Sequence, residues 1–211
     1  MMMNLFSTFD PCTGKLSMNW ISTFMFIFII QKKFWKKNNI NQNMINLIMQ
    51  KLNKEIIMNT KYKSIKLMMI SLMILIMTNN MLGIMPYVYT STSQVNFSMT
   101  LSVPMWISFM LFGWTKNTKL MFTNMLPKNT PSLIMPLMIM IEFTSNLIRP
   151  SSLAVRLSAN MIAGHLLMSL LGEKSMLLIM IMLFMMMFEM AVSIIQSYVF
   201  MTLMTLYSSE V

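Results

Sequence analysis

Residues 131–172 read PSLIMPLMIMIEFTSNLIRPSSLAVRLSANMIAGHLLMSLLG, and their nearly unbroken apolar character indicates a membrane-embedded helical segment. As one helix this run would be about 63 Å long, at about 1.5 Å per residue. The next run, residues 175–209, would be about 52 Å long by the same rise. Because the hydrocarbon core of a bilayer is about 30 Å thick, each run either folds into two passes or forms one steeply tilted helix. Pro150-Ser151-Ser152 could break the first run, so the residues alone leave both alternatives open.

The composition of the whole chain is that of an integral membrane protein. Of its 211 residues, 56% are hydrophobic and 10% are charged, whereas a soluble domain has about 25% charged residues. These values exclude an ordinary soluble enzyme and a disordered chain. The 33 methionines favour an AT-rich mitochondrial gene over a soft-metal site, because they follow no repeated ligand spacing. Cys12 is the only cysteine, which excludes an internal disulfide.

Shorter apolar runs precede the two long ones. Residues 16–31 are predicted to form a retained N-terminal transmembrane helix, because the lysines cluster after this run and only Lys15 precedes it, whereas a signal peptide carries its positive charges before the apolar run. Residues 38–64 combine apolar residues at spacings of three and four with many lysines, which predicts an amphipathic helix on an anionic membrane surface. A nucleic-acid-binding arm is the less favoured alternative. The uncharged residues 67–115 predict a transmembrane hairpin with spans at 67–85 and 96–114.

The positions of the basic residues behind the net charge of +10 indicate how the chain is oriented in the membrane. Twelve of the sixteen basic residues lie in the stretches 32–66 and 116–128, which two predicted spans separate. Lysine-rich loops stay on the side of the membrane where the chain is made. Both stretches are therefore predicted to face the mitochondrial matrix, and the uncharged turn at 86–95 the intermembrane space.

A small set of polar side chains interrupts the two long runs, and it carries the chemistry: Glu142, Arg149, Arg156, Asn160, His165, Glu189 and Gln196. A charged group at mid-membrane costs from about 2.5 to more than about 10 kcal/mol. Because arginine cannot lose its proton, Arg156 must face water, a carboxylate or another protein. Histidine and glutamate can relay protons, so the set predicts a proton path with a fixed cation. The alternative to a proton path is a purely structural role, in which these side chains form hydrogen bonds within and between helices.

Helical spacing divides these residues between two polar compartments. Asn160 lies one turn from Arg156 on the same face, and Glu189 and Gln196, seven residues apart, also share a face. Glu142 aligns with Arg156 to within about 40° on a straight helix. Arg156 and His165, nine residues apart, lie on opposite sides of the helix.

Three motifs, SLAVRLSANMIAGHLL (152–167), EMAVSIIQSYVF (189–200) and NLIRP (146–150) after Ile141-Glu142, resemble the subunit a family of the mitochondrial F-type ATP synthase. The resemblance extends over the whole chain in length and layout, but its specific motifs lie in 141–200. It implies an all-α integral membrane protein with a single membrane domain, 1–211. Its last two helices, 131–171 and 175–209, would form a tilted hairpin against the c-ring, the ring of c subunits that rotates.

The resemblance also implies roles for individual residues. Arg156 matches the arginine that faces the c-ring carboxylates, and Asn160 and Gln196 match its polar neighbours. His165 and Glu189 match the pair that lines the half-channel from the intermembrane space. Glu142 matches the acid of the matrix half-channel, and Arg149 is given no catalytic role.

The function implied is that of the proton-translocating stator subunit of the F0 sector, in the mitochondrial inner membrane. Its expected partners are the c-ring, subunit b, subunit 8 and other stator subunits, together with membrane lipid. No cofactor, metal or nucleic acid is expected, and the chain has no G-x-x-x-x-G-K-[ST] nucleotide-binding loop. A proton-pumping subunit of a respiratory complex without a rotor, and a purely structural membrane scaffold, remain the alternatives.

Overall fold

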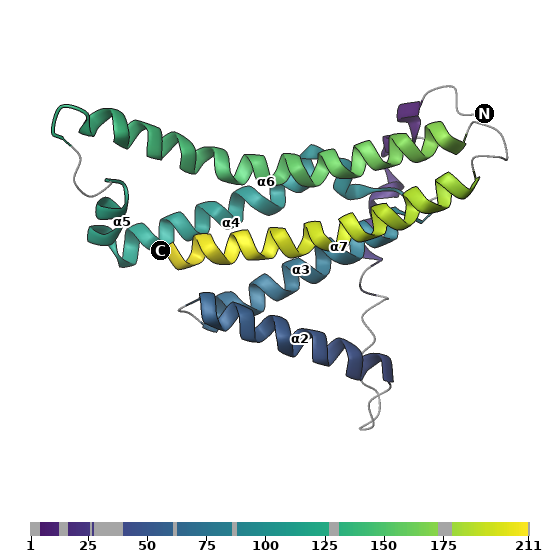
Figure 1. Cartoon of the computed structure of the whole chain (residues 1–211), viewed down its shortest axis with the longest axis horizontal. Helices are drawn as coiled ribbons and strands as arrows, with labels where there is room; N and C mark the ends of the chain where they lie inside the picture. Colours follow the sequence, from purple (N-terminus) through teal and green to yellow (C-terminus); the bar gives the residue numbers. More distant parts are fainter. Residues whose placement is uncertain are drawn as a thin grey trace.

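The computed structural model describes residues 5–12, 17–25, 27, 40–60, 63–85, 88–126, 131–172 and 179–210. Within these residues every regular element is a helix (Figure 1). The α-helices are α2 (Ile40–Asn59), α3 (Lys63–Gly83), α4 (Val95–Lys116), α5 (Thr118–Asn124), α6 (Met135–Gly172) and α7 (Ile179–Glu210). The described residues also include three short 3₁₀-helices, η1 (Leu5–Phe9), η2 (Met18–Phe24) and η3 (Ser91–Ser93). Four of the helices, α3, α4, α6 and α7, are long and apolar enough to cross a membrane. The predicted all-α membrane class is confirmed.

Each long C-terminal run forms one helix rather than two passes. The 38 residues of α6 and the 32 of α7 correspond to about 57 Å and about 48 Å of helix. Figure 1 shows the two helices side by side and running in opposite directions, as a long hairpin. Pro150 lies inside α6 without ending it. The hydroxyls of Ser151 and Ser152 donate to the carbonyls of Ile148 and Arg149 in the same helix.

The predicted hairpin of two shorter spans is α3 and α4, joined by a turn that contains η3. The turn differs from a hydrated loop, because Thr90, Ser91, Thr92 and Ser93 are all buried. They pack against α3, α4 and α6. At the end of α3 a β-carbon on Gly83 would lie 3.0 Å from Cγ2 of Thr90, so glycine permits the close approach of the turn.

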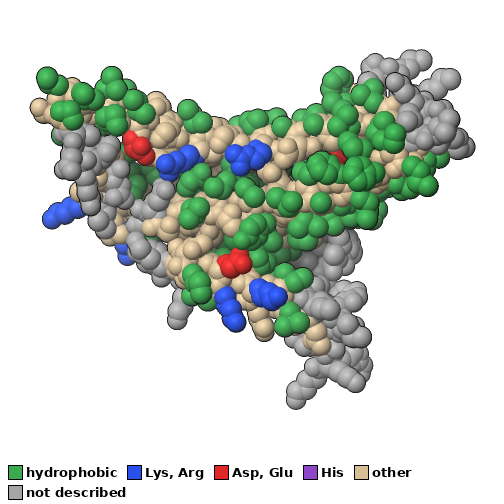
Figure 2. Space-filling view, in the orientation of Figure 1, with side chains coloured by type: hydrophobic (Ala, Val, Ile, Leu, Met, Phe, Trp, Pro, Cys, Tyr) green, Lys and Arg blue, Asp and Glu red, His purple; other side chains and the backbone are tan. Residues whose placement is uncertain are grey.

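The buried core lies where α3 packs against α7 and α2, and where α6 packs against α4. Leucine, isoleucine and phenylalanine fill it together with unbranched methionines, whose flexible side chains adapt to irregular gaps: Ile56, Met69, Ile76, Leu157, Phe200 and Met204. Many other apolar side chains are exposed over α6 and α7 (Figure 2). An apolar outer surface is favourable in contact with lipid and unfavourable in contact with water.

In the N-terminal half, the described residues form a long α-helix within the predicted surface helix and a short 3₁₀-helix within the predicted N-terminal span. Helix α2 spans most of the predicted surface helix at 38–64, although residues 63–64 belong to α3. It buries Ile56 and leaves Lys51 and Lys54 exposed, and Tyr198 of α7 donates to Oε2 of Glu55 at 3.1 Å. Of the predicted span at 16–31, residues 17–25 and 27 are described and include η2. The rest of that prediction lies outside the described residues. Helix α5 lies within the stretch predicted as a basic loop.

Candidate functional site

Three polar side chains meet where α6 packs on α7, and Asn160, Glu189 and Gln196 are here called the hairpin cluster. Nδ2 of Asn160 donates to Oε1 of Gln196 at 3.1 Å. Glu189 and Gln196 are both buried, and all three residues line one small cavity. The seven-residue spacing therefore places Glu189 and Gln196 on one face of α7, as the sequence predicts. The amides can hold hydrogen bonds, and the carboxyl group can bind and release a proton.

Glu189 lies against a glycine of the neighbouring helix. A β-carbon on Gly164 would overlap the Glu189 carboxyl group and would lie 2.8 Å from its Cγ. Glu189 is 9% exposed, and neither of its carboxyl oxygens has a hydrogen-bond partner within the described ranges. Gly164 thus provides the space in which this acid lies, and helical sequence patterns did not single it out.

A larger cavity of about 310 Å³ opens beside the same acid between α6 and α7. Its lining includes Asn160, Gly164, Phe188 and Glu189, and most of the lining surface is apolar. Asn160 and Glu189 border both cavities. The carboxyl group of Glu189, which can exchange a proton, therefore lies between the small cavity inside the helix bundle and the larger cavity between α6 and α7.

His165 is half-buried near the end of α6 and is separate from the hairpin cluster. Its ring lies edge-on to Phe9, with ring centroids 6.3 Å apart and an interplanar angle of 88°. Its Nε2 atom is buried and, among the residues described, has no hydrogen-bond partner. The structure therefore does not join His165 to Glu189 by a hydrogen bond.

Arg156 is exposed on α6. In the described part of the chain it has no ion-pair partner, although it shares its helix with Glu142. An exposed guanidinium on a predominantly apolar membrane helix needs an acceptor or water.

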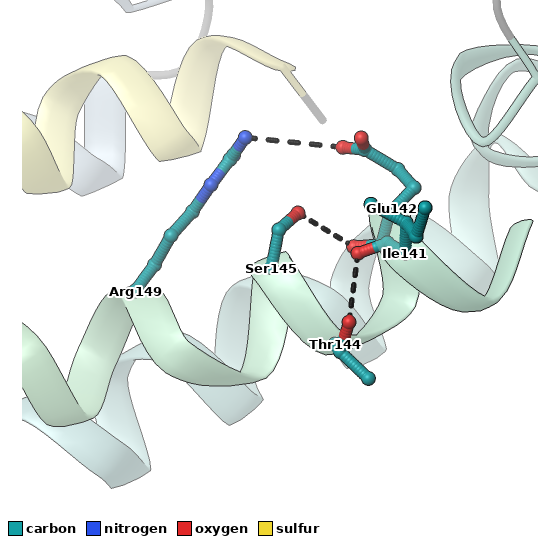
Figure 3. Close-up of polar contacts among 5 residues, drawn as sticks. All are labelled: Ile141, Glu142, Thr144, Ser145 and Arg149. Atoms are coloured by element: carbon teal, nitrogen blue, oxygen red, sulfur yellow. Dashed lines mark hydrogen bonds and ion pairs between the residues drawn. The ribbon is translucent and has the colours of Figure 1, made fainter. Parts of the chain in front are cut away.

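Glu142 pairs with the other arginine of α6. Oε1 of Glu142 lies 3.8 Å from Nη2 of Arg149, one heptad further along the helix (Figure 3). The guanidinium also lies over the ring of Tyr207 on α7, 5.5 Å from the ring centroid. Figure 3 shows the two charged side chains reaching toward each other along the helix. Seven residues separate Glu142 from Arg149 and fourteen separate it from Arg156, and the nearer arginine makes the contact.

Two amides of α3, Asn79 and Asn80, were not among the predicted site residues. Both are buried, and Asn80 lines the small cavity together with the hairpin cluster. Their sequence signal is two adjacent amides inside an uncharged apolar run. No group of three or more metal-ligating side chains of the His, Cys, Asp or Glu type occurs in the described ranges.

Known proteins resemble this chain along its whole length. The sequence profile of the family described as ATP synthase A chain matches residues 14–209. The proteins named ATP synthase subunit a of Aedes aegypti, Locusta migratoria and Drosophila melanogaster are 48%, 46% and 44% identical to it. Each alignment covers 100% of both chains. The chain belongs to the ATP synthase A chain family.

Membership of the ATP synthase A chain family confirms the predicted resemblance and gives the coarse function. The chain is a membrane subunit of ATP synthase, the proton-translocating component of the F0 sector, and it works in a complex with other F0 subunits. Its insect relatives imply a mitochondrial protein. The four helices of the described ranges that are long and apolar enough to cross a membrane indicate a multi-pass membrane protein.

Proposed function

We propose that this chain couples proton flow to rotation of the c-ring through a fixed positive charge at Arg156. The supporting observation is that Arg156 is exposed on α6 and has no ion-pair partner in the described part of the chain. Because its guanidinium stays charged at any physiological pH, a carboxylate of a neighbouring subunit would stabilise it. A ring of carboxylates that passes this position would meet the same charge at every step.

The proton path from the intermembrane space would use His165 and Glu189. Both groups can bind and release protons, and Glu189 borders the larger cavity between α6 and α7. A proton arriving there would neutralise a ring carboxylate, which could then face lipid without the cost of a buried charge. Asn160 and Gln196 would hold their hydrogen bond in either protonation state of the acid.

The path to the matrix would use Glu142 on the same helix. After almost a full turn, a ring carboxyl group would reach this polar region and lose its proton, and the resulting carboxylate would be attracted to Arg156. Arg149 holds Glu142 by their ion pair, so we assign Arg149 a positioning role. A proton that crosses about 100 mV supplies about 2.3 kcal/mol, so several protons contribute to each ATP.

The proposed setting is the mitochondrial inner membrane, with the lysine-rich α2 and α5 regions facing the matrix and the η3 turn facing the intermembrane space. The loop charges support this orientation. The c-ring, subunit b, subunit 8 and lipid are the proposed partners. ATP would be made elsewhere in the complex, because this sequence has no G-x-x-x-x-G-K-[ST] loop.

The test is ATP-driven proton pumping by assembled ATP synthase in membrane vesicles. Arg156→Ala is expected to abolish pumping while the complex still assembles. Arg156→Lys keeps the charge but loses the planar set of donors, and a severe loss of pumping is expected. The matched control is Arg149→Lys, which can keep the ion pair with Glu142 and should pump normally.

Two outcomes would contradict the proposal. An assembled Arg156→Ala enzyme that pumps normally would exclude the fixed-charge mechanism. An Arg156→Lys enzyme that pumps at the parent rate would instead favour the scaffold alternative, in which the side chain only has to be polar.

A further inference from the structure

Asn80 is a buried amide at the end of α3, outside the long hairpin. It is 1% exposed, and its Oδ1 atom has no hydrogen-bond partner among the described residues. A buried carbonyl oxygen without a hydrogen-bond partner is costly, so such groups in native proteins usually bind a water molecule or a ligand.

Asn80 shares a cavity with polar side chains of the hairpin, although Leu157, Met161 and Val192 line the cavity as well. Asn80 lines a cavity of about 10 Å³ together with the hairpin cluster and Ser193, which is close to the volume that one water molecule needs. Helix α3 packs on α7 here, since the Ser193 hydroxyl, which donates to the Met190 carbonyl at 2.8 Å, also lies 3.2 Å from the sulfur of Met81. The cavity is therefore enclosed by three helices, α3, α6 and α7.

The unpartnered atoms around this cavity are complementary to one water molecule. Gln196 accepts from Asn160 through Oε1, which leaves its buried Nε2 as a donor without a partner in the described chain. Oδ1 of Asn80 is an acceptor, and so are the oxygens of the ionised Glu189. One water that accepts from Gln196 and donates to Asn80 and Glu189 would make three hydrogen bonds, the typical number for a buried water.

We propose that Asn80 is a positioning residue that holds a water molecule against Glu189, so that α3 contributes to the proton path. This inference rests on the proposed function of Glu189. A hydronium ion arriving from the intermembrane space gives its proton to the oxygen of this water as the water gives one of its own protons to the Glu189 carboxylate. The hydronium ion becomes water, the acid becomes neutral, and the held water is regenerated with no net charge. Asn80 fixes the orientation of this water and exchanges no proton itself.

An isosteric pair of substitutions tests the role of the side-chain oxygen. Asn80→Val and Asn80→Thr have the same shape, but only threonine keeps an oxygen that can hydrogen-bond to water. In assembled ATP synthase in vesicles, Asn80→Val should slow ATP-driven proton pumping by about tenfold, the equivalent of about 1.4 kcal/mol in the barrier. Asn80→Thr should restore most of the rate. A role in packing alone would affect both variants equally.

Asn79 supplies a matched control on the same helix. It is also buried, and both of its side-chain polar atoms lack partners within the described ranges. One residue turns a helix by about 100°, and Asn79 is absent from the cavity lining. Asn79→Val should therefore pump at close to the parent rate. If the valine variant at position 80 does not assemble, Asn80→Ala and Asn80→Ser provide the same comparison with smaller side chains.

Parent-like pumping by Asn80→Val, equal losses in the two isosteric variants, or an equal loss in Asn79→Val would each overturn the inference. These results leave the proposed function standing as long as Arg156→Ala still abolishes pumping. Normal pumping by Arg156→Ala would contradict the proposed function itself. The Arg156 variant therefore distinguishes failure of the proposed function from failure of the inference about Asn80.

Discussion

Replacing Gly164 with alanine adds one methyl group at the point where α6 meets Glu189. The new carbon would lie 2.8 Å from Cγ of Glu189 and would overlap its carboxyl group. Carbon atoms in contact are normally about 3.5–4.0 Å apart. The Glu189 side chain must therefore leave its position, or the two helices must separate.

The size of the effect follows from this overlap. Overpacking of this kind costs about 1–3 kcal/mol, and if the strain falls on the productive position of Glu189, pumping should slow by about 5-fold to about 150-fold. Helix formation itself should not suffer, because alanine is favoured over glycine by about 1 kcal/mol in a helix interior. The loss is thus expected in transport and not in assembly.

The assay is ATP-driven proton pumping per assembled complex, with Gly172→Ala as the control. Gly172 lies on the same helix, and a β-carbon there would meet no atom of the described residues within 4 Å, so this control should pump normally. Combining Gly164→Ala with Glu189→Asp shortens the acid and should partly relieve the overlap, which a double-mutant cycle would detect. Equal pumping by Gly164→Ala and Gly172→Ala would refute the reasoning.

Three further substitutions probe the polar contacts of the hairpin. Asn160→Leu removes the hydrogen bond to Gln196 and leaves the buried amide of Gln196 unpaired. The melting temperature of the complex should therefore fall, by an amount that reflects a loss of about 1–3 kcal/mol in stability. An unchanged melting temperature would contradict this. Arg149→Met breaks a partly exposed ion pair worth at most about 1 kcal/mol, so pumping should fall by less than about fivefold. A loss as complete as that expected for Arg156→Ala would show that Arg149 does more than position its partner. Tyr198→Phe removes the hydrogen bond between α7 and α2 and should leave pumping unchanged, and failure of the complex to assemble on a native gel would contradict that expectation.

The membrane helices were predictable because charge and hydropathy act locally. The uncharged run 67–115 predicted two spans, and helices α3 and α4 begin and end within a few residues of the predicted bounds. The path of the chain at Pro150 was not predictable from the residues alone. A proline breaks a helix or not according to whether the freed backbone groups find partners, and those partners depend on the packed structure.

The candidate site was predictable in part for the same reason. Charged groups in an apolar run stand out, so Arg156 and Glu189 were identified from the sequence. Asn80 was missed because an amide in a membrane helix is also a common helix–helix contact. Its importance depends on a cavity that residues of three helices form together. Gly164 was missed because a glycine shows its effect only through the side chain that fills the space beside it.

The buried turn at η3 has a mechanical consequence. Its polar side chains bond within the turn, since Oγ1 of Thr90 donates to Oγ of Ser93 at 3.1 Å and the Ser93 hydroxyl donates to the Thr90 carbonyl at 2.6 Å. The turn contacts α3, α4 and α6. Because closely packed protein interiors have low compressibility, they transmit strain. A sideways load on α6 at this level would pass into both shorter helices, so the turn braces the long hairpin here.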